Sequence, residues 1–184
     1  MANISLPVSV DPFAELKQVL NKELEKLTDD ERQAITKYSG FSATEINRRI
    51  YGGLKLGRYE KQVKLLSSAL SKFVIPQSIT VYRKMLAKDF GIDANNLYRF
   101  VGATSTLNGF ASTSLKPDVL FLGRDLTLII DIPKGYKGAL FIGDTVYSKY
   151  QYQEEVLFNQ GLTIRIKAAK LVGNTCEIYA EAIP

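Results

Sequence analysis

The chain has 184 residues, of which 46 % are hydrophobic and 23 % are charged, an ordinary composition for a globular protein. It contains no histidine and a single cysteine, Cys176. Ser-His and Cys-His nucleophilic sites and an intramolecular disulfide are therefore excluded, and no metal site is expected. The net charge of +5 suits an anionic ligand or partner, but the lysines and arginines are dispersed, so nucleic-acid binding is not predicted.

The length and the hydropathy pattern predict one domain without a membrane span. No apolar run reaches the ~20 residues that a membrane-spanning helix requires. Residues 1–7 lack the charged segment and the long apolar segment of a secretory signal. We expect a single domain over residues 1–184, with helices over about 1–75 and strands over about 76–184.

Four helices are expected in the first part of the chain, because apolar residues recur there every three or four positions. They cover about residues 13–27, 28–40, 42–52 and 58–73. The segment Thr28-Asp29-Asp30-Glu31 has the sequence of a capping box at the start of the second helix. Pro76 prevents the fourth helix from continuing.

The rest of the chain predicts strands, because apolar and β-branched residues alternate with polar ones. The expected strands are 79–85, 109–114, 126–132, 139–142, 154–158, 162–167 and 176–182, with residues 87–107 as a connection. Helices that precede the strands indicate an α+β fold, and the half-buried alternation is typical of antiparallel sheets. The chain has no Gly-rich phosphate loop, so a Rossmann dinucleotide site is not supported.

Arg83 is an anomaly in the strand expected at 79–85. By alternation it shares one face of that strand with Ile79, Val81 and Met85. Either its guanidinium leaves the apolar face at a sheet edge, or it meets an anion in a cleft.

Polar residues also interrupt two other predicted strands. Ser112 and Ser114 share one face of theirs, which a functional site and a plain polar strand end explain equally well. Glu155 shares a face with Leu157. Its carboxylate points either into a cleft, where it needs a partner, or to solvent at an ordinary strand start. Glu154 faces the other way and is expected to be solvated.

The order and spacing of Arg83, Ser112-Thr113-Ser114 and Gln153-Glu154-Glu155 resemble the Arg, Ser-Thr-Ser, Gln-x-Glu triad of bacterial mono-ADP-ribosyltransferase toxins. The resemblance extends to the family's NAD-facing helix pair, its phosphate-nicotinamide loop with the following strand, and its catalytic strand, at residues 34–47, 121–135 and 155–157. Gln153, together with the aromatic Tyr150 three residues earlier, resembles the Rho-inactivating exoenzyme branch. The resemblance implies an α+β fold in which the helices pack on a mixed, mainly antiparallel core of two sheets.

The resemblance also implies a reaction, the transfer of ADP-ribose from NAD to a protein side chain, in a single catalytic domain without a metal. Glu155 would stabilise an oxocarbenium-like transition state, and Ser112 would orient its carboxylate. Arg83 and Arg124 would hold the pyrophosphate, which a guanidinium suits by charge and by geometry.

Further contacts follow from the same resemblance. Asn47 would bond the adenosine-side ribose or phosphate, the backbone at Lys84 would bind the nicotinamide amide, and Phe121 would pack on the nicotinamide side. Gln153 would recognise the amide of an acceptor asparagine, because its own amide offers a donor and an acceptor. Tyr150 would pack against the target protein, and Tyr152 is a second candidate for that contact.

The implied protein is a monomer that a bacterium secretes and that modifies a Rho-type small GTPase in the host-cell cytosol. Two alternatives stay open. One is transfer to arginine, or plain NAD hydrolysis. The other is a catalytically silent fold that binds a partner, which Tyr51 suggests, because family members often carry an arginine at that position, four residues after Asn47.

Overall fold

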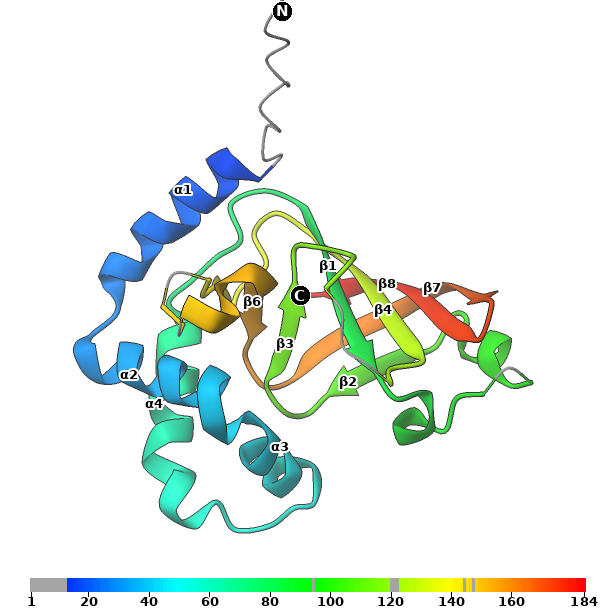
Figure 1. Cartoon of the computed structure of the whole chain (residues 1–184), viewed down its shortest axis with the longest axis horizontal. Coiled ribbons are helices and arrows are strands. Elements are labelled where there is room, and N and C mark those ends of the chain that lie inside the picture. The colour runs from blue at the N-terminus through cyan, green and yellow to red at the C-terminus, as the bar shows by residue number, and fades with distance from the viewer. Residues whose placement is uncertain (1–12, 94, 120–122, 144, 147) are drawn as a thin grey trace, which may run out of the picture.

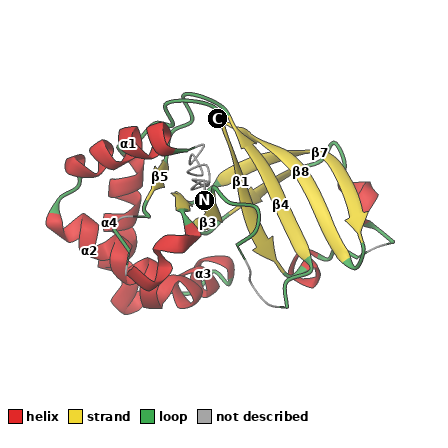
Figure 2. Ribbon diagram, turned by 45° about the horizontal axis from the view of Figure 1, so that its top comes forward, coloured by secondary structure: helices red, strands yellow, loops and turns green. Residues whose placement is uncertain are grey.

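The computed structural model describes residues 13–184 except 94, 120–122, 144 and 147. Within these residues, the helices occupy the first part of the chain and gather at one end of a twisted sheet (Figures 1 and 2). They are α1 (Ala14–Glu23), α2 (Asp29–Lys37), α3 (Ala43–Tyr51) and α4 (Glu60–Ser71). All four predicted helices are thus confirmed. No helix in the described part of the chain is long and apolar enough to cross a membrane.

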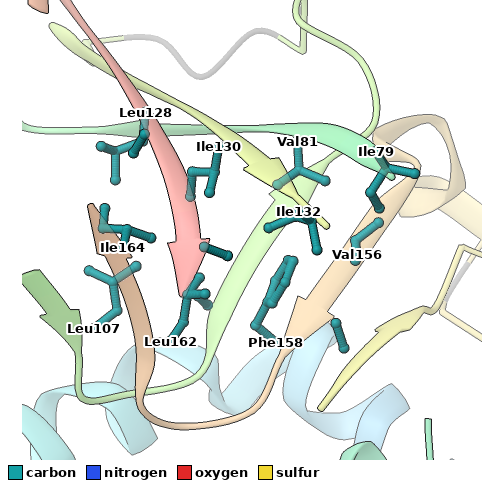
Figure 3. Close-up of a cluster of buried hydrophobic side chains, with 14 of the residues drawn as sticks. Ile79, Val81, Leu107, Leu128, Ile130, Ile132, Val156, Phe158, Leu162 and Ile164 are labelled. Atoms are coloured by element: carbon teal, nitrogen blue, oxygen red, sulfur yellow. The ribbon is translucent and has the colours of Figure 1, made fainter. Parts of the chain in front are cut away.

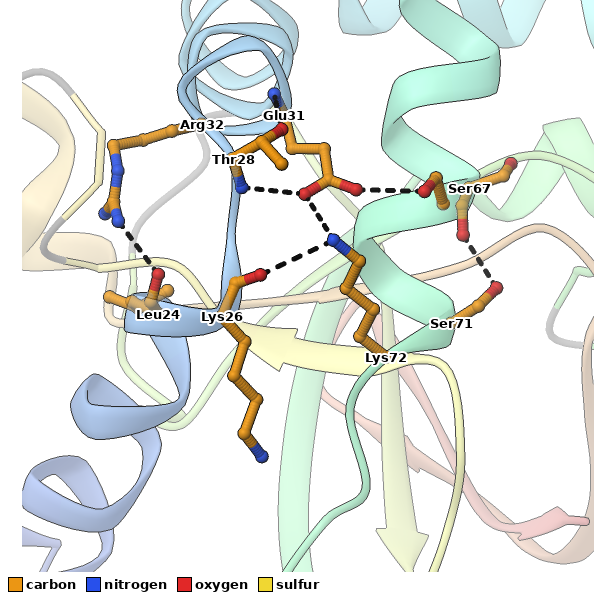
Figure 4. A network of polar contacts seen from close by, with 9 residues as sticks. Leu24, Lys26, Thr28, Glu31, Arg32, Ser67, Ser71 and Lys72 are labelled. Carbon is orange, nitrogen blue, oxygen red and sulfur yellow. Dashed lines mark hydrogen bonds and ion pairs between the residues drawn. The ribbon is translucent and has the colours of Figure 1, made fainter.

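A polar network explains why α2 begins where the sequence indicates. Thr28 and Glu31 form the predicted capping box: the backbone N–H of each donates to the side chain of the other, at 2.9 and 3.3 Å. The buried Glu31 carboxylate also accepts hydrogen bonds from Lys72 Nζ (2.6 Å) and Ser68 Oγ (2.9 Å) (Figure 4). The network therefore ties the start of α2 to the end of α4.

The connection between α2 and α3 differs from the expected stop near Gly40. The backbone continues as a single π-helical turn, Tyr38–Ser42, that runs directly into α3. Such turns often lie at functional sites, because the extra residue redirects the neighbouring side chains. Here Tyr38 is fully buried, and the Ser39 hydroxyl reaches a residue of the sheet.

Eight strands form the sheet within the described residues. They are β1 (Ile79–Met85), β2 (Thr104–Leu107), β3 (Ala111–Ser114), β4 (Leu126–Ile132), β5 (Ala139–Phe141), β6 (Glu155–Phe158), β7 (Leu162–Val172) and β8 (Thr175–Ile183). Their order in the sheet is β2-β7-β8-β4-β1-β3-β6-β5. Strand β2 was expected to be part of a connection. It lies at the edge of the sheet and consists mostly of polar residues. Its sequence therefore has no apolar run that would predict a strand.

The sheet is mixed and mainly antiparallel, as predicted: β4 and β8 form its parallel pair, and the other named strand pairs are antiparallel. The expected two sheets are, however, joined into one. The joint between β1 and β3 is a single residue pair, Tyr82 and Ser114. This narrow joint separates the long strands β7-β8-β4-β1, with the short edge strand β2 beyond them, from the short strands β3-β6-β5, and the α+β fold class is confirmed.

Two hydrophobic clusters cover opposite faces of the short strands. Val156 and Phe158 of β6 belong to a cluster that joins the long strands to Leu16 and Leu20 of α1 (Figure 3). Leu157, which points to the other face, packs with the cluster formed by α2, α3 and α4. Because all four residues of β6 are buried, its first residue, Glu155, enters the interior on the same side as Leu157.

Candidate active site

The narrow joint of the sheet brings the three predicted motifs together. Ser114 of β3 is paired with Tyr82 of β1 on one side and with Glu155 of β6 on the other. A cleft of about 480 Å³ opens at this point. Of the predicted site residues, it is lined by Asn47, Arg83, Lys84, Ser112, Arg124, Gln153 and Glu155. The segments that carry them are α3, β1, β3, the approach to β4, the 3₁₀ helix Ser148–Gln153 and β6.

Glu155 is the buried carboxylate of this cleft, only 4 % exposed. Its Oε2 accepts a hydrogen bond of 2.7 Å from the Ser39 hydroxyl of the π-helical turn. Burial raises the pKa of Glu155, while hydrogen bonds from Ser112 and Ser39 and the positive charge of Arg83 oppose that rise. The cleft alternative of the sequence interpretation is therefore the observed one, and the solvated strand start is not.

Arg83 lies inside the cleft rather than at an edge, because β1 is flanked by β4 and β3. Its Nη1 donates a hydrogen bond of 2.7 Å to the backbone carbonyl of Ser112. Its Nε is buried and has no hydrogen-bond partner in the part of the chain that the structure describes. Burial lowers the pKa of the Arg83 guanidinium, an effect that the nearby Tyr38, Tyr51 and Glu155 oppose. A buried guanidinium N–H without a partner suits an anionic ligand.

The three hydroxyls of β3 have different tasks. Thr113 Oγ1 donates to the carbonyl of Val156 at 2.8 Å, and Ser114 Oγ accepts from the backbone N–H of Lys116 at 2.8 Å. Ser112 is the hydroxyl whose hydrogen bonding affects the pKa of both Glu155 and Tyr38. The alternation of side chains along the strand turns Thr113 to the face opposite Ser112 and Ser114.

Asn47 lines the cleft but is already engaged by the protein. Its Nδ2 donates to the carbonyl of Phe110 and to the hydroxyl of Tyr38, each at 3.0 Å, and its Oδ1 accepts from the N–H of Phe110 at 3.0 Å. The contact requires glycine at position 109, where a Cβ would lie 2.5 Å from Oδ1. Asn47 therefore holds the start of β3 against α3, and a ligand contact through its N–H groups would replace one of these bonds.

The other predicted contact residues are placed in different ways. Arg124 is exposed and lines the cleft, whereas Lys84 directs its Nζ to Thr127 Oγ1 (2.9 Å) and lines the cleft as part of β1. Phe121 lies outside the described residues. Tyr150 does not line the cleft; it is half-buried and packs against the helical cluster.

The aromatic that projects into solvent beside the cleft is Tyr152, which is 58 % exposed. Its hydroxyl accepts a hydrogen bond of 3.4 Å from Nε2 of Gln153. Gln153 is the last residue of a 3₁₀ helix, Ser148–Gln153, and lines the cleft. The Gln-x-Glu pattern therefore presents an amide and a carboxylate to the same cleft.

Glu154 differs from its expected place in solvent. It is only 8 % exposed and has a left-handed backbone, with φ of 45°. Its Oε1 forms ion pairs with Lys17 Nζ of α1 (2.6 Å) and with Lys116 Nζ after β3 (2.8 Å). The expectation of a solvated acid was wrong, because it assumed a regular strand from residue 154, whereas β6 begins at Glu155.

Sequence reasoning also missed the roles of Tyr38 and Ser39. Tyr38 is fully buried between Asn47 and Phe110, its ring meeting that of Phe110 edge to face at 5.4 Å. Burial raises its pKa, so its hydroxyl stays neutral. Ser39 bonds Glu155 because of the π-helical turn. The one signal in the sequence was Tyr-Ser-Gly, three residues of modest helix propensity between two helical patterns.

The chemistry of the cleft suits a negatively charged ligand that reacts next to a carboxylate. Arg83, Lys84, Lys116 and Arg124 surround it, and its acids among the described residues are Asp89 and Glu155. No group of three or more His, Cys, Asp or Glu side chains that could hold a metal ion occurs in the described part of the chain.

Comparisons with known proteins find similar sequences and similar folds. A sequence profile described as ADP-ribosyltransferase exoenzyme matches residues 16–182. The epidermal cell differentiation inhibitor of Staphylococcus aureus is 25 % identical over 221 residues, which cover 100 % of this chain and 87 % of that protein.

Solved structures share the fold. Plx2a, an ADP-ribosyltransferase toxin from Paenibacillus larvae, is 27 % identical, with a TM-score of 0.82 over 91 % of this chain and 92 % of its own. C3stau2 from S. aureus, solved with NAD, is 23 % identical, with a TM-score of 0.76 over 92 % and 94 %.

Proposed function

The chain belongs to the ADP-ribosyltransferase exoenzyme family, and we propose on that premise that it transfers ADP-ribose from NAD to an asparagine side chain of a Rho-type small GTPase. The observation that carries the proposal is that one cleft holds Arg83, Ser112 and Glu155 with Gln153 beside them. Family membership favours an enzyme over a silent binding module, although Tyr51 occupies the position of a family arginine.

NAD is the co-substrate, and the cleft offers groups that suit it. Arg83 would hold the pyrophosphate through its unsatisfied Nε, and the exposed Arg124 would hold it from the other side. The backbone beside Lys84 would bind the nicotinamide amide. Asn47 would meet the adenosine-side ribose after exchanging one of its bonds to Phe110 or Tyr38. Phe121, outside the described residues, would pack on the nicotinamide.

Glu155 would carry the chemistry. When the bond between nicotinamide and ribose breaks, positive charge develops on the ribose, and an ionised carboxylate beneath it stabilises that charge. Ser39 and Ser112 would keep this carboxylate oriented and ionised, because their hydrogen bonds oppose the rise in its pKa. Tyr38 and Arg83 line the same cleft beside this carboxylate.

The acceptor is inferred from Gln153. Its amide lines the cleft, and its hydrogen bond to Tyr152 is long at 3.4 Å, so the amide is available to pair with the amide of an asparagine. Tyr152, more exposed than the half-buried Tyr150, is the better placed of the two to contact the surface of the target. A family named for exoenzymes supports secretion, and a Rho-type target would place the reaction in the host cytosol.

The test is to incubate the protein with labelled NAD and purified Rho, then map the label by mass spectrometry. We expect one asparagine of Rho to be labelled, and no label with Glu155→Gln. Label on a different protein in a cell extract, with none on Rho, would refute the proposed target while leaving the enzyme class intact.

Transfer to arginine, or NAD hydrolysis alone, is the competing reaction. Gln153→Glu separates the two, because a carboxylate at this place would pair with arginine rather than with asparagine. We expect this variant to lose asparagine transfer and to keep most of its NAD cleavage. If the variant still labels asparagine at the wild-type rate, Gln153 does not determine the choice of acceptor.

A further inference from the structure

Glu154 has a backbone conformation that is unusual for its residue type. Among the described residues it is the one non-glycine with a positive φ, 45°. A side chain in the left-handed region is strained, because its Cβ crowds the following carbonyl. The residue stands between Gln153, which ends a 3₁₀ helix, and Glu155, which begins β6. The strain is therefore located between the two residues of the Gln-x-Glu pattern.

The side chain of Glu154 supplies contacts that offset this strain. Its Oε1 binds two ammonium groups, Lys17 Nζ at 2.6 Å and Lys116 Nζ at 2.8 Å. The carboxylate is 11 % exposed, Lys17 is 18 % exposed, and Lys116, which also lines the cleft, is 46 % exposed. A buried carboxylate without such partners would be unfavourable. The two lysines therefore stabilise the backbone conformation that places the Glu154 carboxylate between them.

These contacts join three segments that are distant in the sequence. Lys17 comes from α1, and Lys116 comes from the loop after β3. A backbone hydrogen bond joins the turn to the end of β3 as well: the N–H of Leu115 donates to the carbonyl of Glu154 at 3.1 Å. The turn is thus clamped between the first helix and the strand that carries Ser112.

Glu155 and Gln153 differ in how much they need this clamp. Glu155 is held by its pairing with Ser114, by the bond from Ile142 N–H to its carbonyl (2.9 Å), and by Ser39. Among the described residues, the side chain of Gln153 has one hydrogen bond, the 3.4 Å contact with its neighbour Tyr152. Loss of the clamp should therefore move Gln153 far more than Glu155.

We propose that Glu154, held by Lys17 and Lys116, is a positioning residue that fixes Gln153 relative to Glu155. It thereby sets how efficiently the ADP-ribose of NAD is transferred to a protein acceptor rather than to water. The inference rests on the proposed function. It assigns α1, which contributes no described residue to the cleft, a part in acceptor transfer through Lys17.

The experiment measures two rates for each variant: transfer to the protein acceptor, and NAD hydrolysis without acceptor. Glu154→Gln keeps the size of the side chain and removes its charge. We expect the ratio of transfer to hydrolysis to fall about tenfold, mostly through kcat of transfer, with the KM for NAD changed less than twofold. A purely structural role would lower both rates together and leave their ratio unchanged.

Lys17→Gln is the matched partner variant. Because Lys17 does not line the described cleft, a fall in the ratio reports the turn rather than a lost contact with NAD. The double variant Lys17→Gln with Glu154→Gln should be no worse than Glu154→Gln alone, since both changes break the same contact. Lys64→Gln, which removes an exposed ion pair with Glu60 on α4, is the control and should leave the ratio unchanged.

Failure of this inference and failure of the proposed function are distinguishable. If the wild type transfers ADP-ribose and Glu154→Gln keeps the wild-type ratio, the positioning role is refuted and the function stands. If the wild type cleaves no NAD, the proposed function is refuted, and amide hydrogen exchange tests the clamp instead. The backbone amides of residues 115 and 154 should exchange faster in Glu154→Gln than in the wild type. Unchanged exchange would refute the clamp. Should Glu154→Gln not fold, Lys17→Gln, altered outside the described cleft, takes its place in both measurements.

Discussion

At the scale of single residues, Glu155 shows the conflict between stability and chemistry. Its carboxylate is buried, and burial disfavours the ionised form that the reaction would need. Ser39, Ser112 and Arg83 offset part of this penalty and do not remove it, since the pKa of Glu155 remains above its ordinary value of 4.5. The ionised carboxylate is thus tolerated in the fold at a cost in stability.

The sign of the pH dependence follows from this raised pKa. Between the unfolded pKa near 4.5 and the higher folded pKa, the folded protein binds more protons than the unfolded one, so the free energy of unfolding decreases as pH rises through that interval. Glu155→Gln should therefore raise the melting temperature at pH 7 and have little effect at pH 4. It should also lower the rate of NAD cleavage by about 10²–10³-fold.

Thermal unfolding at the two pH values, with Glu25→Gln as an exposed control, measures this prediction. The control should leave the melting temperature unchanged at both. A lower melting temperature for Glu155→Gln at pH 7 would mean that the ionised carboxylate stabilises the fold, contrary to our account.

At the scale of elements, the capping network of α2 links two helices through one carboxylate. Burial acts to raise the pKa of Glu31, but the hydrogen bonds from Lys72, Thr28 and Ser68 outweigh it and lower the pKa to about 2. Because the folded pKa is depressed, the contribution to stability is present above pH 4.5 and is lost as pH falls toward 2. The network therefore predicts an acid-sensitive junction between α2 and α4.

Glu31→Gln should lower the free energy of unfolding by about 2 kcal/mol at pH 7, because the amide accepts fewer bonds and leaves Lys72 without its charge partner. Urea unfolding at pH 7 and at pH 2.5 measures the effect, and the difference from wild type should shrink at the lower pH. Glu60→Gln is the matched control on α4, since its ion pair with Lys64 is exposed. An equal loss in both variants would count against the buried network.

At the scale of the whole molecule, the cleft lies where the two parts of the sheet meet. It is lined by residues of α3, β1, β3 and β6, and β1 and β3 are joined by one residue pair. A ligand bound here contacts both parts of the sheet and the helical end at once. Binding should therefore tighten a joint that the backbone itself makes weakly.

NAD should accordingly raise the melting temperature of the wild type, with a stabilisation of about 2.7 kcal/mol at a concentration of 100 Kd. Amide exchange should slow in both β1 and β6. Arg83→Gln should lose most of this NAD-induced shift, measured against its own ligand-free baseline, whereas Lys64→Gln should keep it. Protection confined to one part of the sheet would contradict a ligand that spans the joint.

By itself the sequence determined the order and type of most elements, because these depend on local signals. The capping box at Thr28, the apolar stripe of α4 and the alternation in β8 each act within a few residues. The family resemblance carried by Arg83, Ser112, Gln153 and Glu155 likewise predicted one shared cleft, although not its geometry. Polar edge strands such as β2 carry no comparable signal.

Only the tertiary structure decided where the remaining site residues lie. Glu154 is buried because Lys17, 137 residues away, and Lys116 meet its carboxylate. Ser39 contacts Glu155 across 116 residues because a π-helical turn replaces the expected helix end. Burial and ion pairing between distant segments depend on how the elements pack, and no local pattern of residues encodes that.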